Sequence, residues 1–109
     1  VDKARSSLNL AKDNADNLGV DDHQVSFQQG DALKVLTELD QDFGLVFLDP
    51  PYKQDLAAKA LSGLTRVLQK GSIVVVETEK DAVFDVSADY EILRDKIYGQ
   101  SRVMIIRRV

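Results

Sequence analysis

The stretch from Gly44 to Tyr52 constrains the fold of this chain more than any other segment. An almost wholly apolar run, Gly44 to Leu48, passes there into an acid, two prolines and an aromatic residue. The apolar run predicts a buried strand. Pro50 and Pro51 cannot continue that strand, because proline has no backbone N–H for a sheet ladder. A carboxylate is therefore expected at the carboxyl end of a buried strand, the edge at which open α/β sheets bind ligands.

The rest of the chain alternates between helical and strand patterns. Apolar residues recur at spacings of three and four over three predicted helices, residues 2–18, 32–39 and 55–68. Alternating or continuous apolar runs predict five strands, at residues 25–27, 45–48, 72–77, 90–98 and 101–107. The expected N-caps are Asp2, Asp31 and Asp55, and Lys70-Gly71 is the expected end of the third helix.

This order of elements predicts an α/β fold in a single domain. Alternating strands and helices favour a mostly parallel sheet, with helices on both faces and right-handed crossovers. The last two strands are joined through Tyr98-Gly99-Gln100-Ser101, which is too short for a parallel crossover, so they are expected to form an antiparallel hairpin. The chain of 109 residues begins with a helix, and the strand that would feed this helix is expected to be absent.

Composition narrows the possible functions. The sequence has no cysteine and one histidine, which argues against disulfides and against thiolate or histidine metal sites. It shows no membrane-spanning run and no signal-peptide pattern, so we expect a cytoplasmic protein without membrane association. The net charge of -4 does not suit binding of nucleic acid by bulk electrostatics, so such a role requires a local basic face or residues outside this chain.

The residues Asp49-Pro50-Pro51-Tyr52 suit the chemistry of a ring amine. The Asp49 carboxylate and an unpaired carbonyl beside it could accept both N–H groups of an exocyclic amine. Such bonds favour a more tetrahedral nitrogen, whose lone pair can then attack an electrophilic methyl group in line. The ring of Tyr52 offers a face on which a base can stack. The alternative is a strand-ending turn, in which Asp49 caps the backbone and Tyr52 packs sideways.

Asp31 is the second candidate site residue. It follows a predicted strand and opens a predicted helix, eighteen residues before Asp49, so it is expected at the same edge of the sheet. A carboxylate there could accept from an adenine amino group, although a plain N-cap is the simpler interpretation. Weaker candidates have mainly structural or solvated alternatives, and they are His23, Glu77, Arg102, Arg107 and Arg108.

The Asp-Pro-Pro-Tyr string resembles the catalytic motif of S-adenosylmethionine-dependent amino-methyltransferases. Together with Gly30-Asp31-Ala32, the run Ile73 to Glu77 and the late hairpin, it resembles the bacterial RsmD-type family over nearly the whole chain. These Rossmann-like class I enzymes methylate the N2 amine of a guanine in small-subunit ribosomal RNA. The motif itself does not separate RNA guanine from DNA adenine or cytosine, and the hairpin and the length favour RNA guanine.

The resemblance implies roles for individual residues. Asp49 and the Pro50 carbonyl would hold the target amine, Pro51 would stiffen the loop, and Tyr52 would stack on the base. Asp31 and the backbone of Ala32 would hold the adenine of S-adenosylmethionine. The implied partner is ribosomal RNA, or a pre-ribosomal particle, with the target base unpaired or flipped out.

The resemblance also implies a departure at the start of the chain. The family's Gly-rich loop and ribose-binding acid have no counterpart here, so residues 1–109 are expected to be the C-terminal part of a methyltransferase domain without its first strands. Exposed strand edges would then favour self-association. Two alternatives remain open. One is a non-catalytic fragment or interaction domain of the same ancestry, and the other is an unrelated nucleotide-binding α/β domain.

Overall fold

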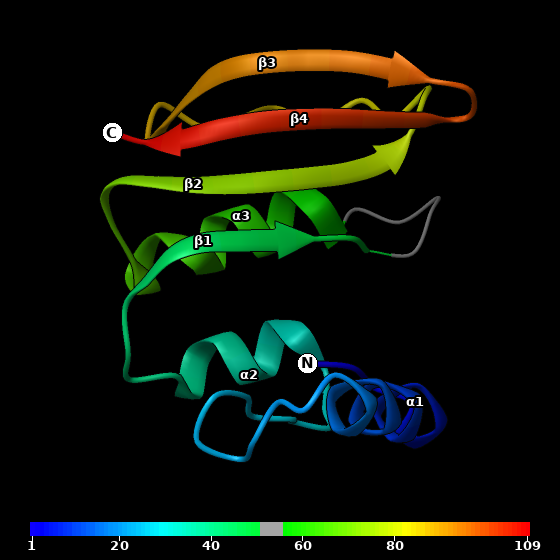
Figure 1. Cartoon of the computed structure of the whole chain (residues 1–109). Coiled ribbons are helices and arrows are strands. Elements are labelled where there is room, and N and C mark those ends of the chain that lie inside the picture. Colours follow the sequence, from blue (N-terminus) through cyan, green and yellow to red (C-terminus); the bar gives the residue numbers. More distant parts are fainter. Residues whose placement is uncertain (51–55) are drawn as a thin grey trace. The chain divides into compact units, whose positions relative to one another are not determined.

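The computed structural model describes residues 1–50 and 56–109, which form two compact units, Val1–Glu38 and Leu39–Val109. The first unit contains helices α1 (Arg5–Asn17) and α2 (Ala32–Glu38). The second contains β1 (Phe43–Leu48), α3 (Leu56–Leu64), the short 3-10 helix η1 (Thr65–Val67), β2 (Leu68–Glu79), β3 (Tyr90–Tyr98) and β4 (Ser101–Arg108), as Figure 1 shows. Within the described residues, no helix has the length and apolar character needed to cross a membrane.

The four strands of the second unit form one mixed sheet in the order β1-β2-β4-β3 (Figure 1). β1 and β2 are parallel, whereas β4 is antiparallel to both β2 and β3. The α/β class and the C-terminal hairpin predicted from the sequence are confirmed. Parallel pairing is less extensive than expected, because only one of the three pairings in this sheet is parallel.

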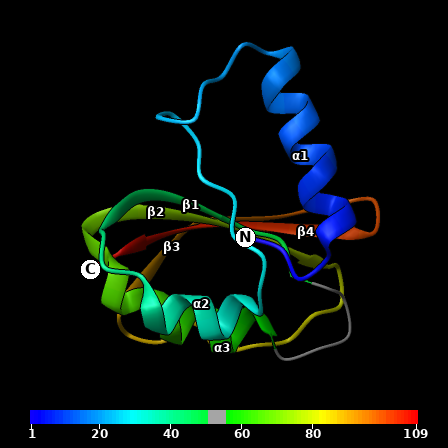
Figure 2. The ribbon, with the colours of Figure 1, turned by 90° about the horizontal axis from the view of Figure 1, so that it is seen from below.

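One face of the sheet carries the core of the second unit, and α3 lies against it (Figure 2). We call it the covered face, and its most buried side chains are Val74, Val76, Met104 and Ile106, each at most 2% exposed. The opposite face, here called the open face, carries the alternate residues of each strand. On β1 these are Leu45 and Phe47, which are 55% and 75% exposed. The strict alternation follows from the two-residue period of a strand.

The third helix ends earlier than the sequence predicts. The α-helix stops at Leu64, η1 carries the chain to Val67, and β2 already begins at Leu68. Lys70-Gly71 is therefore not a helix end but part of β2. Gly71 has a φ of 89°, and the five steps of β2 from Leu68 to Ile73 face only two steps of β1, so the glycine belongs to an irregularity in the parallel ladder.

The predicted strand at residues 25–27 is wrong, because this segment has no strand partner. The first unit has only an isolated parallel bridge between Asp2 and Gln29. Asp2 is not the N-cap of α1 either: the cap position is Ala4, whose N–H donates to the Asp2 carboxylate at 2.8 Å. The predicted cap Asp55 lies outside the described residues.

Tyr90 fastens the start of the hairpin to α3. Its side chain is buried, and its hydroxyl donates a hydrogen bond to the backbone carbonyl of Leu61 in the last turn of the helix. Helical carbonyls in that turn lack partners within the helix, so the tyrosine supplies one. Burial raises the pKa of Tyr90 to about 12, against an opposing effect of Arg108.

We expect Tyr90→Phe to lower the free energy of unfolding by about 1–3 kcal/mol at neutral pH, because it leaves a buried carbonyl unpaired. The difference in the free energy of unfolding between the wild type and Tyr90→Phe should shrink above pH 10. An unfolded tyrosine loses its proton near pH 10, whereas Tyr90 keeps its proton until about pH 12, so the stabilisation is lost as the pH rises through this window. Urea unfolding of both proteins at about pH 8 and about pH 11 measures the difference. A gap of equal size at both pH values would contradict this account.

Candidate active site

Asp49 and Pro50 lie directly after β1, at the carboxyl end of the parallel pair. Leu48 is paired with Val76 of β2, so Asp49 leaves the sheet beside Glu77. Asp49 is exposed and Pro50 is half-buried. The predicted position at a strand end is thus confirmed for these two residues. The predicted burial of that strand is wrong, because β1 lies at the edge of the described sheet and none of its residues is buried. Pro51 and Tyr52 lie outside the described residues, and their roles stay predictions.

Asp49 and Pro50 present two hydrogen-bond acceptors, a carboxylate and a backbone carbonyl. In the part of the chain that the structure describes, the Asp49 carboxylate accepts no hydrogen bond. Pro50 has a carbonyl acceptor and no N–H. An exposed carboxylate beside such a carbonyl matches a group with two N–H donors. The backbone of Asp49 is held in place because the preceding residue, Leu48, is still paired in the sheet.

Asp31 caps α2 in the first unit. Its Oδ1 accepts the N–H of Leu33 at 2.9 Å, and its backbone carbonyl accepts the N–H of Val35, also at 2.9 Å. The predicted N-cap is therefore confirmed. Ala32 is the first residue of this helix and is exposed. Within residues 1–50 and 56–109, the other carboxylate oxygen of Asp31 and the N–H of Ala32 form no turn or cap hydrogen bond, so these neighbouring residues offer one acceptor and one donor.

The turn before Asp31 is held on both sides. The N–H of Gly30 donates to the carbonyl of Asp2 at 2.9 Å, and the N–H of Asp2 donates to the carbonyl of Gln28 at 3.1 Å. A Cβ on Gly30 would lie 3.2 Å from Cγ2 of Val35, a contact tighter than an ordinary one. Any larger residue here would press on Val35 of α2, a constraint that the sequence position alone does not reveal.

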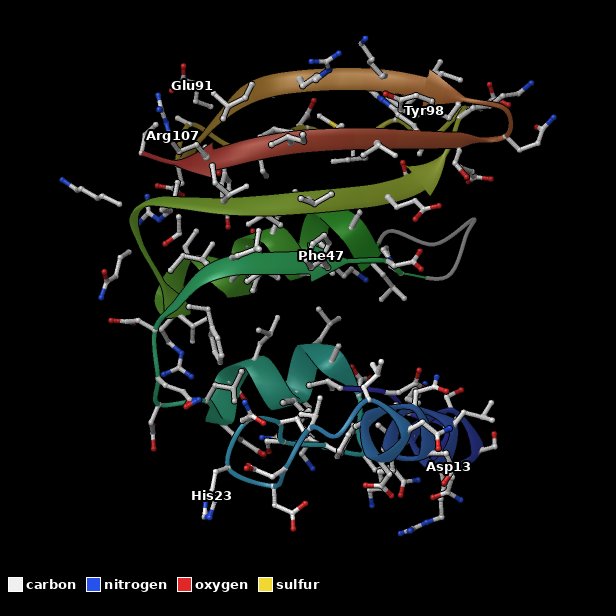
Figure 3. The ribbon with its side chains drawn as sticks, in the orientation of Figure 1. Asp13, His23, Phe47, Glu91, Tyr98 and Arg107 are labelled. Carbon is white, nitrogen blue, oxygen red and sulfur yellow. The ribbon has the colours of Figure 1, made fainter. Side chains whose placement is uncertain are left out.

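The three arginines among the weaker candidates all have acidic partners in the structure. Arg102 binds both carboxylate oxygens of Asp95, at 2.8 and 2.6 Å, and donates to the carbonyl of Ala82 at 2.8 Å. Arg107 pairs with Glu91 at the other end of the hairpin, as Figure 3 shows, and Arg108 pairs with Asp89. The hydrogen bonds from Arg102 lower the pKa of the Asp95 carboxyl. These arginines hold the hairpin and its preceding loop together.

Of the remaining weak candidates, His23 lies in a loop as predicted, whereas Glu77 lies within β2, which continues to Glu79 and does not end at Glu77 as predicted. His23 is exposed in a loop of the first unit, where its backbone N–H donates to Oδ1 of Asp21 at 2.8 Å. Glu77 is half-buried on the open face of β2. Among the side chains that the structure describes, no group of three or more could together hold a metal ion.

An acid and a proline at the carboxyl end of a parallel strand pair, in a sheet closed by an antiparallel hairpin, define the Rossmann-like methyltransferase class. A methylase of Haemophilus influenzae, provisionally so assigned, has this fold with a TM-score of 0.86 and 26% identity, over 98% of this chain and 69% of its own. A conserved hypothetical protein of Streptococcus pyogenes superposes with a TM-score of 0.88 and 27% identity, over 98% of this chain and 68% of its own.

Residues 1–107 match the model of the family described as Conserved hypothetical protein 95, and the chain belongs to this family. It is 40% identical to an uncharacterized methylase of Rickettsia prowazekii over 67 residues. This match covers 60% of this chain and 28% of the methylase. It is 37% identical over 59 residues, 52% of the chain, to the ribosomal RNA small subunit methyltransferase D of Haemophilus influenzae, of which it spans 31%. The chain thus spans less than a third of these curated relatives.

Proposed function

We propose that this protein is an S-adenosylmethionine-dependent N-methyltransferase that acts on the exocyclic amine of a guanine in small-subunit ribosomal RNA. The observation that carries the proposal is the Asp49-Pro50 pair at the carboxyl end of β1. Membership of the family and the likeness to a small-subunit ribosomal RNA methyltransferase support it. Residues 1–109 would form the C-terminal part of the methyltransferase domain.

The proposed mechanism uses the chain to hold and orient the amine. Asp49 and the Pro50 carbonyl accept its two N–H bonds, which draws the nitrogen toward a tetrahedral geometry and directs its lone pair outward. Pro51 restricts the loop, and Tyr52 stacks on the base. The bound cofactor supplies an electrophilic methyl group. The donor and acceptor at Ala32 and Asp31 match the ring nitrogen and the amino group of adenine, so these residues fit the cofactor.

A labelling experiment tests the proposed substrate. The protein is incubated with S-adenosylmethionine carrying a labelled methyl group and with unmethylated small-subunit or large-subunit ribosomal RNA, and the label is mapped by nuclease digestion. We expect label on a guanine of the small-subunit RNA. Label on large-subunit RNA would favour a second candidate, because the chain is also 30% identical, over 73% of its length, to the ribosomal RNA large subunit methyltransferase K/L of Shewanella loihica. Incorporation into neither RNA would contradict the proposal.

Substitution of Asp31 separates its capping role from cofactor binding. Serine is about as good an N-cap as aspartate, so Asp31→Ser should leave stability nearly unchanged, whereas Asp31→Ala should cost about 1 kcal/mol. Serine is too short to replace the second carboxylate oxygen. We therefore expect both variants to bind S-adenosylmethionine about 10-fold or more weakly, the usual loss for a hydrogen bond to a charged group. Calorimetric titration gives the affinity, and wild-type affinity in Asp31→Ser would exclude a role for this acid beyond the cap.

A further inference from the structure

An irregularity in β3 decides on which face of the sheet each of its side chains lies. The pairing of β3 with β4 shifts between Ile92 and Arg94, where Leu93 is inserted. A one-residue insertion of this kind exchanges the two faces of the strand beyond it. Asp95 therefore lies on the covered face, where it meets Arg102. Without the bulge, Asp95 would lie among the residues of the open face.

The same shift places two bases and an aromatic ring on the open face. Arg94, Lys96 and Tyr98 are the cross-strand partners of Ile105, Val103 and Ser101, which alternate along the open face of β4. All three are exposed, Tyr98 by 60%. Figure 3 shows Tyr98 at the turn end of the hairpin, with Glu91 and Arg107 at the other end. We call Arg94, Lys96 and Tyr98 the β3 row.

In the described residues, the basic side chains of the β3 row do not take part in the polar interactions that hold the hairpin together. The side chains of Arg94 and Lys96 have no ion pair or hydrogen bond there, unlike the arginines of β4. Glu91, the other charged residue of β3 on this face, is neutralised by Arg107 at 2.5 Å. The acid Glu77 of this face lies on β2, about 10 Å away across two strand spacings. Positive charge therefore dominates locally on β3, although the chain is acidic.

The β3 row lies at the same end of the sheet as the candidate active site. Lys96 is level with Val103, which is level with Glu77, and Asp49 leaves the sheet beside Glu77. Tyr98 lies two residues further toward that end. Three strand spacings separate β1 from β3, a distance of about 14 Å. A chain with its base at Asp49 could therefore reach the β3 row within a few nucleotides.

We infer that the β3 row binds single-stranded RNA next to the target nucleotide, with Arg94 and Lys96 on phosphates and Tyr98 stacked on a base. Bases on one strand and an aromatic ring beside them are the two elements of single-strand binding. The row runs along an edge strand, so a strand of RNA can follow it without displacing protein. This inference rests on the proposed function, since it concerns the RNA that would carry the target guanine.

Fluorescence anisotropy with a labelled single-stranded RNA of roughly 12 nucleotides, in the absence of cofactor, tests the inference. Arg94→Gln with Lys96→Gln should lower the slope of log affinity against log salt by about 1.4, the value for two phosphate contacts. Tyr98→Ala should weaken binding about 5- to 150-fold, and Tyr98→Phe should stay within about twofold of wild type. The matched control is Lys59→Gln with Lys70→Gln, which removes the same charge from α3 and from the far end of β2, and we expect no more than about a twofold change.

Three results would overturn the inference: no RNA binding by the wild-type protein, wild-type binding by the β3-row variants, or an equal loss in the lysine control. A Tyr98→Ala protein that changes its sedimentation but not its RNA affinity would also overturn it, because the row would then join two protein copies. The proposed function fails separately, if the wild-type protein transfers labelled methyl groups to neither ribosomal RNA. RNA binding without cofactor does not depend on that result.

Discussion

Asp49→Ala should reduce the rate of methyl transfer by at least about 100-fold while leaving the affinity for S-adenosylmethionine nearly unchanged. The expected size is that of removing one preorganised hydrogen-bonding group from a charge-developing reaction. Asp49 is exposed at a strand end and its carboxylate has no hydrogen-bond partner in the described residues, so removal of this side chain should not destabilise the sheet. Initial rates with labelled cofactor give the first quantity, and calorimetry gives the second.

Two further variants make this test specific. Asp49→Asn keeps one acceptor oxygen without the charge, and it should retain more activity than Asp49→Ala. Asp85→Ala removes an exposed carboxylate from the loop before β3, and its rate should equal that of the wild type. Near-normal turnover in Asp49→Ala would contradict the amine-holding mechanism. Loss of cofactor binding together with activity would instead assign Asp49 to the cofactor site.

The elements with a clear period could be predicted from the sequence. The two strands of the hairpin start at Tyr90 and Ser101, as their patterns indicated, because alternation and a two-residue turn at Gly99 leave little choice. β1 and the position of Asp49 also follow from local sequence, since an apolar run that stops at two prolines has one reasonable interpretation. The cap at Asp31 likewise depends only on its neighbours in the chain.

The errors arise where long-range packing decides between local alternatives. Val67 and Leu68 fit the helical stripe that precedes them, but both are equally suited to the strand that follows, and both are buried. Pairing with Phe43 of β1 draws Leu68 into the sheet. Residues 25–27 alternate as a strand does, and they lack a neighbouring strand among the described residues. The bulge at Leu93 leaves no sequence signal, so the outward position of the β3 row could not be predicted.

The two faces of the sheet should respond very differently to truncation of adjacent residues on β4. Ile106 is fully buried on the covered face, between Val74 of β2 and Ile92 of β3. We expect Ile106→Ala to lower the free energy of unfolding by about 2–5 kcal/mol, the range for a buried isoleucine whose cavity does not collapse. That is a large part of the 5–15 kcal/mol that is typical of a whole domain, so the variant should be close to unfolding at 37 °C or below.

Ile105→Ala is the matched control, because it removes the same atoms one residue away, on the open face. Ile105 is only half-buried, so its truncation should cost less than half as much as that of Ile106. Urea unfolding followed by circular dichroism compares the two variants. An equal cost for both would mean that the open face is as tightly packed as the covered face in solution. Phe47 and Ile105 would then be covered in solution by further protein on the open face. The β3 row lies at the margin of the open face and would be the part of this face that RNA can reach.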